Sequence, residues 1–156
     1  MLFVNLLQVW FISMLPLIEL RGAIPISQAM GLPVWPSYIV CILGNMLPIP
    51  FVYIYSERFL KWGKNKKYVG RFCRWCLKRG YKAGEKLSKK TSGAGLFFGL
   101  MLFVGIPIPG TGAWTGIMAA SILNMGWKSA TLAVALGVLL AGAIMMTASY
   151  FGFNLI

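Results

Sequence analysis

The stretch "LIELRGAIPIS", Leu17–Ser27, decides the fold because it interrupts a long apolar region with charged and helix-breaking residues. Glu19, Arg21, a glycine and a proline fall within seven residues. Charged side chains are costly in hydrocarbon, and glycine and proline weaken a helix. We therefore expect residues 2–31 to form a helical hairpin whose arms are 2–15 and 24–30. The expected break contains Pro16, Glu19, Arg21, Gly22 and Pro25.

A second stretch, "GIPIPGTGAWTG" (Gly105–Gly116), interrupts the other half of the chain in the same way. Its arms are expected at 93–104 and 113–123, within a hairpin that covers 93–125. The residues expected to stop the helix and free the backbone are Pro107, Pro109, Gly110 and Gly112. Irregular backbone at membrane depth is tolerated only where it is buried in protein or lines a watery cavity. Both breaks are therefore candidate linings of such a cavity.

The composition predicts an all-α polytopic membrane protein. Hydrophobic residues make up 58% of the 156 residues, with only three acidic side chains and no histidine. About 20 apolar helical residues cross a hydrocarbon core, and residues 34–57 and 127–153 each provide such a helix. The hairpin arms are too short for this, since the longer arm, 2–15, is about 21 Å as a helix against a core of about 30 Å.

The central segment, residues 58–92, carries most of the charge. Thirteen of the fifteen Lys and Arg residues lie between Arg58 and Lys90. Such a loop between apolar halves is expected to be cytoplasmic and to lie as a basic amphipathic helix on the anionic leaflet, and nucleic acid is not an expected partner. Cys73 and Cys76 lack further ligands for zinc, so no metal or cofactor is predicted.

The two halves of the sequence resemble each other. Residues 1–57 and 93–156 each contain a broken hairpin, a Met-Gly pair and an apolar helix. With a cytoplasmic loop, re-entrant hairpins would make the halves inverted repeats with opposed tips and with both termini outside. Four kinked crossings are the alternative, with both termini inside. The apolar start of the chain lacks a basic leader and is expected to be retained.

Glu19 is the only acidic residue inside an apolar segment, which makes it a functional candidate. A carboxylate balanced between burial and a nearby cation can take up and release protons. Arg21 keeps its charge and must pair with a carboxylate or meet an anion. A Glu19–Arg21 clamp that only holds the hairpin tip is the structural alternative.

The second break offers hydroxyl groups and free backbone N–H groups. Helices are expected to start after Gly22 and Gly112, with their positive dipole ends facing the tips. Together with Arg21 they favour a phosphate or a carboxylate. Asn45 is a candidate for the same cavity, and Trp114 packs either an apolar tail or a neighbouring helix. The predicted substrate-binding residues are Arg21, Gly22, Asn45, Thr111, Gly112, Trp114 and Thr115.

These stretches carry a resemblance to a known family. "PLIELRGAIP" (Pro16–Pro25) and "IPIPGTGAWTG" (Ile106–Gly116) closely resemble the two signature stretches of the small multidrug export protein family of prokaryotes. That family is distantly similar to the DedA/VTT superfamily, which implies opposed re-entrant hairpins in the prokaryotic cytoplasmic (inner) membrane. Some DedA-type members move lipid phosphates, although this chain has no arginine at its second tip.

Three functions follow as expectations. The first is a proton-coupled transporter or flippase for an anionic amphiphile, such as a lipid phosphate, with Glu19 carrying the proton. The second is a proton-coupled exporter of lipophilic cations, and the third is a non-transporting membrane assembly protein. No nucleophile–base pair suggests an enzyme. Small residues at Ala133, Gly137 and Ala141 favour either a homodimer or close internal packing.

Overall fold

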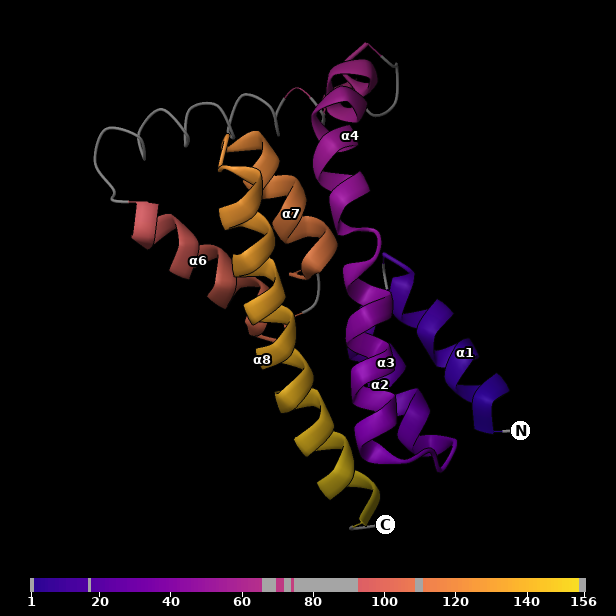
Figure 1. Cartoon of the computed structure of the whole chain (residues 1–156). Helices are drawn as coiled ribbons and strands as arrows, with labels where there is room; N and C mark the ends of the chain where they lie inside the picture. Colours follow the sequence, from indigo (N-terminus) through magenta and orange to yellow (C-terminus); the bar gives the residue numbers. More distant parts are fainter. Residues whose placement is uncertain are drawn as a thin grey trace.

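The computed structural model describes residues 2–16, 18–65, 70–71, 74, 93–108 and 111–154, and these residues form helices joined by short turns (Figure 1). Most of the basic segment 58–92, including Cys73 and Cys76, lies outside the described residues. The described helices are α1 Leu2–Met14, α2 Glu19–Ala29, α3 Val34–Met46, α4 Ile49–Gly63, α6 Gly93–Gly105, α7 Ala113–Ile122 and α8 Trp127–Asn154.

The first break is shorter than the sequence predicts. Helix α1 ends at Met14 and α2 begins at Glu19, so Pro16 lies in the break as expected. Arg21 and Gly22, however, belong to the first turn of α2, and Pro25 lies inside the helix rather than in the tip. The missing N–H of a proline removes a single helix hydrogen bond, which α2 tolerates.

The second break matches its prediction within one residue at each end. Helix α6 ends at Gly105 and α7 begins at Ala113, with Pro107 between them. Pro109 and Gly110 lie outside the described residues. The N–H of Gly112 donates to the Thr115 hydroxyl at 2.8 Å, which fixes the start of α7.

The predicted crossing 34–57 is divided into two helices. Residues Val34–Ser56 have the length and apolar composition of a membrane span, but α3 and α4 meet in a turn at Leu47–Pro48. Pro48 and Pro50 have no N–H for the carbonyls four residues before them, so the helix cannot continue unbroken. The other predicted crossing, 127–153, forms the single helix α8.

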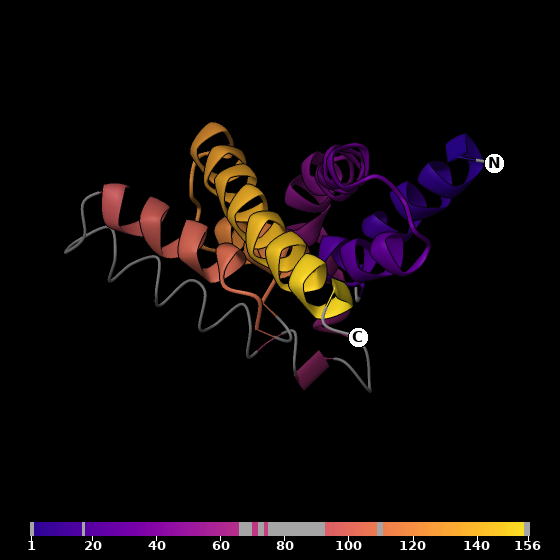
Figure 2. The same cartoon turned by 90° about the horizontal axis from the view of Figure 1, so that it is seen from below.

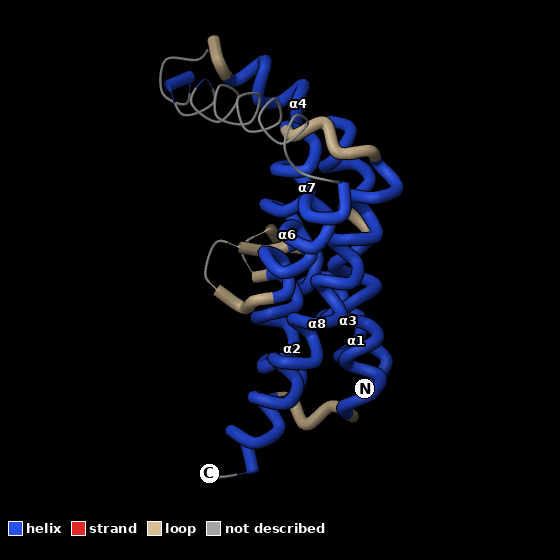
Figure 3. The backbone as a smooth tube through the Cα atoms, turned by 90° about the vertical axis from the view of Figure 1, so that its left-hand side faces the viewer, coloured by secondary structure: helices blue, strands red, loops and turns tan. Residues whose placement is uncertain are grey.

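Helix α8 of the second half lies between α6 and the helices of the first half. Seen from below, α6 lies on one side of α8 and α1 to α3 on the other (Figure 2). Helix α8 contacts α2, α3, α6 and α7, and α4 contacts α7. The tube view shows the elongated shape, with the N- and C-termini near one end and α4 at the other (Figure 3).

The stripe of small residues on α8 is used inside the chain. Ala133, Gly137 and Ala141 are all buried. A β-carbon on Gly137 would lie 2.7 Å from the Met101 carbonyl oxygen and 2.7 Å from the Val104 β-carbon, both on α6. Of the two expected roles for the stripe, its Gly137 position therefore serves internal packing.

Candidate functional site

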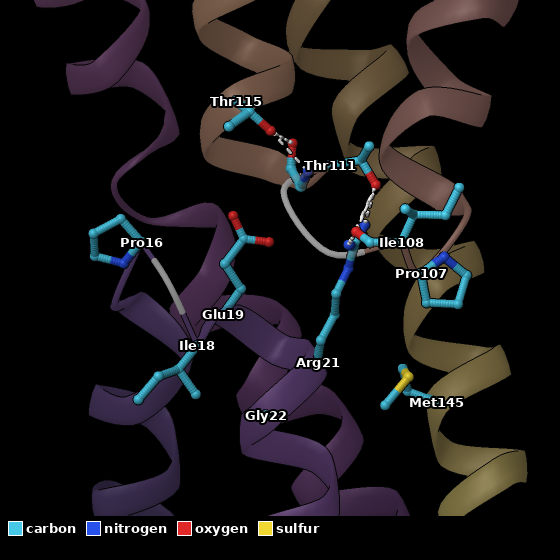
Figure 4. Close-up of a pocket in the computed structure, with 11 residues that line it drawn as sticks. Pro16, Ile18, Glu19, Arg21, Gly22, Pro107, Ile108, Thr111, Thr115 and Met145 are labelled. Atoms are coloured by element: carbon cyan, nitrogen blue, oxygen red, sulfur yellow. Dashed lines mark hydrogen bonds between the residues drawn. The ribbon is translucent and has the colours of Figure 1, made fainter.

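The two broken tips meet at a cavity of about 430 Å³ (Figure 4). Most of the predicted tip residues that the structure describes contribute to its wall, together with Met145 from α8. The cavity is lined by Pro16, Ile18, Glu19, Arg21, Gly22, Pro107, Ile108, Thr111, Gly112, Thr115 and Met145. Residues about 90 positions apart in the sequence thus share one site, where the two predicted tips meet.

Glu19 caps the first turn of α7 from the opposite hairpin. Its side chain is only 6% exposed. Ala113 donates its N–H to Glu19 Oε2 at 3.3 Å, and Trp114 donates its N–H to Oε1 at 3.2 Å. The first N–H groups of a helix have no partner within the helix, and its N-terminus favours negative charge. The carboxylate therefore accepts hydrogen bonds from the free N–H groups of α7, and its negative charge complements the positive end of the helix dipole.

Gly112 makes this approach possible. A β-carbon at this position would lie 2.1 Å from Glu19 Oε2 and 2.5 Å from Oε1. The backbone of Gly112 is extended, with φ −156°, so the glycine is needed for space and not for an unusual conformation. Gly112 was predicted to break the helix and bind substrate, and in the structure it makes room for the Glu19 carboxylate.

Arg21 caps the other side of the same break. Its guanidinium donates to the Val104 oxygen at 3.0 Å, the Ile106 oxygen at 3.1 Å, the Ile108 oxygen and the Thr111 hydroxyl at 3.3 Å. The last carbonyls of a helix lack internal donors and favour a cation. Arg21 therefore completes the C-terminal end of α6, as Glu19 completes the N-terminal end of α7.

The arrangement revises the predicted anion site. Helix α2 begins at Glu19 and not after Gly22, and the free N–H groups at the start of α7 are already engaged by a carboxylate. Each charge binds the opposite tip, so Glu19 and Arg21 hold the two hairpins together instead of only holding their own tip. The sequence holds one signal for these contacts. Glu19 and Arg21 are opposite charges two residues apart, and the second break has a negative helix C-terminus at one end and a positive helix N-terminus at the other.

Two predicted site residues lie elsewhere. Asn45 does not line the cavity. It is fully buried on α3, where neither its side-chain oxygen nor its nitrogen has a hydrogen-bond partner among the described residues. The indole of Trp114 lies against α4 in a separate pocket with Val52 and Tyr55. Of its two predicted alternatives, packing on a neighbouring helix is correct, and only its backbone N–H reaches Glu19.

The apolar rim of the cavity was not predicted. Ile18 and Ile108 line the cavity and are partly exposed on its outside. Both flank the charged residues, so the polar floor lies beside side chains suited to lipid. No sequence signal separates these isoleucines from the many other apolar residues of the chain.

These features define an all-helical membrane protein: its described exterior carries many exposed large apolar side chains, two segments have the length of membrane spans, and an acid and an arginine bridge two broken hairpins. The chain belongs to the family described as "Putative small multi-drug export protein", whose sequence model matches residues 19–144. The match starts at Glu19, after Pro16, and includes Arg21 and the whole second break. No curated protein and no solved structure matches the chain.

Proposed function

We propose that the protein is a proton-coupled transporter for an anionic amphiphile, such as a lipid phosphate, which binds where the two tips meet. The observation that carries the proposal is the position of the Glu19 carboxylate on the N–H groups of Ala113 and Trp114. The start of α7 holds an anion in a buried site, and that anion belongs to the protein itself. A substrate phosphate or carboxylate has the same chemistry and can take its place.

Competition between Glu19 and the substrate would couple transport to protons. Protonation removes the charge of Glu19 and weakens its two charge-assisted hydrogen bonds to α7. The N–H groups of α7 then donate to the substrate anion, with Arg21 beside them. Loss of the proton restores the carboxylate, which returns to α7 and displaces the substrate. The Glu19 carboxylate and the substrate anion thereby alternate on the same backbone donors, and the proton binds Glu19 while the substrate is bound.

The rim of the cavity supports an amphiphilic substrate. Ile18 and Ile108 are 38% and 53% exposed beside the charged floor. An anionic headgroup could reach Arg21 while its apolar tail stays in lipid next to these isoleucines. A fully polar substrate would gain nothing from such a rim.

The proposed topology follows the repeats 1–57 and 93–156. Helices α1 and α2 have 13 and 11 residues, or about 20 Å and 17 Å, too short for a core of about 30 Å. We propose that hairpins 2–31 and 93–125 are re-entrant from opposite sides, as the implied likeness to DedA proteins also suggests. The basic segment 58–92 then lies on the anionic cytoplasmic leaflet of a prokaryotic inner membrane, with the termini outside.

Export of lipophilic cations is the second candidate. The donors of both terminal nitrogens of Arg21 are engaged by backbone and hydroxyl oxygens, which leaves Glu19 as the charge that a cation could meet. The family description, which names multidrug export, favours the same function. In this mechanism Glu19 exchanges a proton for the cation, and Arg21 takes no part in binding the cation.

Flux into proteoliposomes tests both candidates. A fluorescent lipid phosphate and a lipophilic cation are compared for the wild-type protein, Glu19→Gln, Arg21→Ala and Arg21→Lys, with Lys128→Gln as an exposed charge-removal control. The proposal predicts that Arg21→Ala abolishes anion flux and that Glu19→Gln removes its pH dependence. Cation flux that survives Arg21→Ala supports the second candidate. If folded variants change neither flux, the tips serve assembly alone.

A further inference from the structure

The place that the Glu19 carboxylate occupies has a defined set of hydrogen-bond donors. Ala113 and Trp114 each donate one N–H to one carboxylate oxygen, at 3.3 Å and 3.2 Å. The N–H of Gly112 is not available to a ligand, because it donates to the Thr115 hydroxyl at 2.8 Å. The start of α7 therefore offers two neighbouring N–H groups, one for each of two oxygens, to an anion that takes the place of Glu19.

Arg21 provides one further donor. It lines the same cavity and extends toward the second break (Figure 4). Its two terminal nitrogens donate to oxygens of that break, but its Nε–H is buried without a hydrogen-bond partner among the described residues. A buried donor without a partner is unfavourable, so a ligand oxygen that reaches this N–H gains a hydrogen bond that replaces no other.

The space beside Gly112 is suited to a small planar group. A β-carbon on Gly112 would lie 2.1 Å from Glu19 Oε2 and 2.5 Å from both Oε1 and Cδ. The backbone of Gly112 therefore packs against the whole carboxylate group. A phosphate is bulkier and tetrahedral, and it brings additional oxygens into the same space. The close approach of Gly112 therefore favours a carboxylate.

The charges around the cavity determine which ligand charge can be balanced. Among the described residues that line it, only Glu19 and Arg21 are charged, and their signs are opposite. When Glu19 is protonated, the charge of Arg21 has no counterion, and a buried charge without a partner is costly. One singly charged anion restores the balance. A phosphate monoester carries about −1.5 to −2 charges at pH 7, so it would leave excess negative charge in the site.

We propose that the site at the two tips is specific for a singly charged carboxylate amphiphile, such as a long-chain fatty acid, which takes the place of the Glu19 carboxylate. The exposed side chains of Ile18 and Ile108 at the rim provide apolar contacts for its chain. The inference rests on the proposed function, in which a substrate anion displaces Glu19, and it decides between the phosphate and the carboxylate that this function allows. One proton on Glu19 then accompanies each bound anion.

Three probes with the same ten-carbon chain separate the shape of the headgroup from its charge. Decanoate has one charge on a planar group, decyl methyl phosphate has one charge on a tetrahedral group, and decyl phosphate is close to doubly charged at pH 8. Equilibrium dialysis of each radiolabelled probe against the full-length protein in nanodiscs of zwitterionic lipid, with empty nanodiscs subtracted, measures saturable binding. At pH 8 we expect the wild-type protein to bind decanoate about fivefold more tightly than either phosphate.

Two substitutions connect this binding to the tips. In the wild-type protein the affinity for decanoate should fall as the pH rises from 7 to 9, because binding takes up a proton. Glu19→Gln removes the competing anion, so we expect decanoate to bind about tenfold more tightly at pH 8 and without this pH dependence. Arg21→Ala should lose saturable binding. Lys128→Gln, which removes an exposed charge outside the cavity, is the control.

The headgroup preference of the wild-type protein tests the proposal without any variant. If either phosphate binds as tightly as decanoate and requires Arg21, the carboxylate specificity is wrong while the proposed function stands. If no probe binds saturably, or if binding ignores both Arg21→Ala and Glu19→Gln, the tips hold no anion site, and the proposed function fails as well. Preferential binding of decanoate that requires Arg21 and loses its pH dependence in Glu19→Gln supports the inference.

Discussion

Glu19 and Arg21 each stabilise one end of a single broken hairpin, with the sign that the helix dipole requires. A buried charge without partners costs several kcal/mol. Here Glu19 accepts two N–H groups from α7, and Arg21 donates to the carbonyls at the end of α6. Two charges that would be costly alone are therefore placed where two helix ends also need partners.

Gly112→Ala tests the position of the Glu19 carboxylate without removing its charge. The new β-carbon would overlap the carboxylate, while the extended backbone at this position accepts alanine. We expect Glu19 to leave α7 and the free energy of unfolding in detergent to fall by about 2 kcal/mol, since hydrogen bonds to charged groups are worth about 1.5–3 kcal/mol. Gly126→Ala, with no atom within 4 Å of its β-carbon, should be neutral. Equal stability of the two variants would contradict the cap.

Arg21→Lys tests the planar fork of the guanidinium. One ammonium cannot reach oxygens of Val104, Ile106 and Thr111 at the same time. We expect amide hydrogen exchange near the end of α6 to become at least tenfold faster, because the last turn loses its cap. Arg58→Lys on α4 provides the control. Unchanged exchange in Arg21→Lys would show that only charge is required at this position.

At the scale of the helices, the sequence was most informative where several helix-breaking residues coincide. The second break was predicted within one residue because Pro107 is followed by glycines and α7 starts at a glycine cap. The start of α2 was predicted too late. Glu19 begins the helix with φ 52°, and the partners of Glu19 and Arg21 lie on the other hairpin, which local sequence rules do not include.

The direction in which individual side chains point could not be predicted from the sequence. Trp114 follows the second predicted tip and Asn45 lies inside the predicted crossing 34–57. The direction in which each helix packs takes Asn45 into the core and the indole of Trp114 toward α4. The pairing of Glu19 with Ala113 spans 94 residues. Sequence indicated that the two tips should meet, whereas the contacts within the site required the packing of α2, α7 and α8.

Gly137→Ala tests the close approach of α6 and α8. The nearest atoms to a new β-carbon are a backbone oxygen and the β-carbon of Val104, neither of which can move without a shift of α6. We expect a loss of about 1–3 kcal/mol in unfolding free energy, which is typical of overpacking. Gly99→Ala on α6, where the β-carbon meets nothing within 4 Å, should be neutral or slightly stabilising. If Gly137→Ala is also neutral, the helices are less tightly packed than the structure shows.

At the scale of the whole molecule, α8 is the element that both halves share. It contacts α2 and α3 on one side and α6 on the other. The Glu19–Arg21 contacts join the same two halves directly at the tips. A change in the protonation of Glu19 would therefore act on one polar connection between the two halves, which Tyr38, Tyr53 and Ser121 also join by hydrogen bonds elsewhere.

The position of the termini distinguishes re-entrant hairpins from full crossings. Both termini lie toward one end of the molecule, and the outer part of α4 lies at the other (Figures 1 and 3). Because α1 has only 13 residues, or about 20 Å, it cannot cross a core of about 30 Å.

With the native cysteines replaced, we expect a membrane-impermeant thiol reagent to label Phe3→Cys and Gly152→Cys from outside intact spheroplasts. Trp62→Cys should react only after permeabilisation, because we propose that the basic loop that follows it is cytoplasmic. Labelling of Phe3→Cys and Gly152→Cys only from the inside would establish four crossings, and labelling of the two from opposite sides would show that a single hairpin crosses. In either case the tips could not approach one another from opposite leaflets, and the exchange of Glu19 for a substrate anion would need a different path to the membrane surfaces.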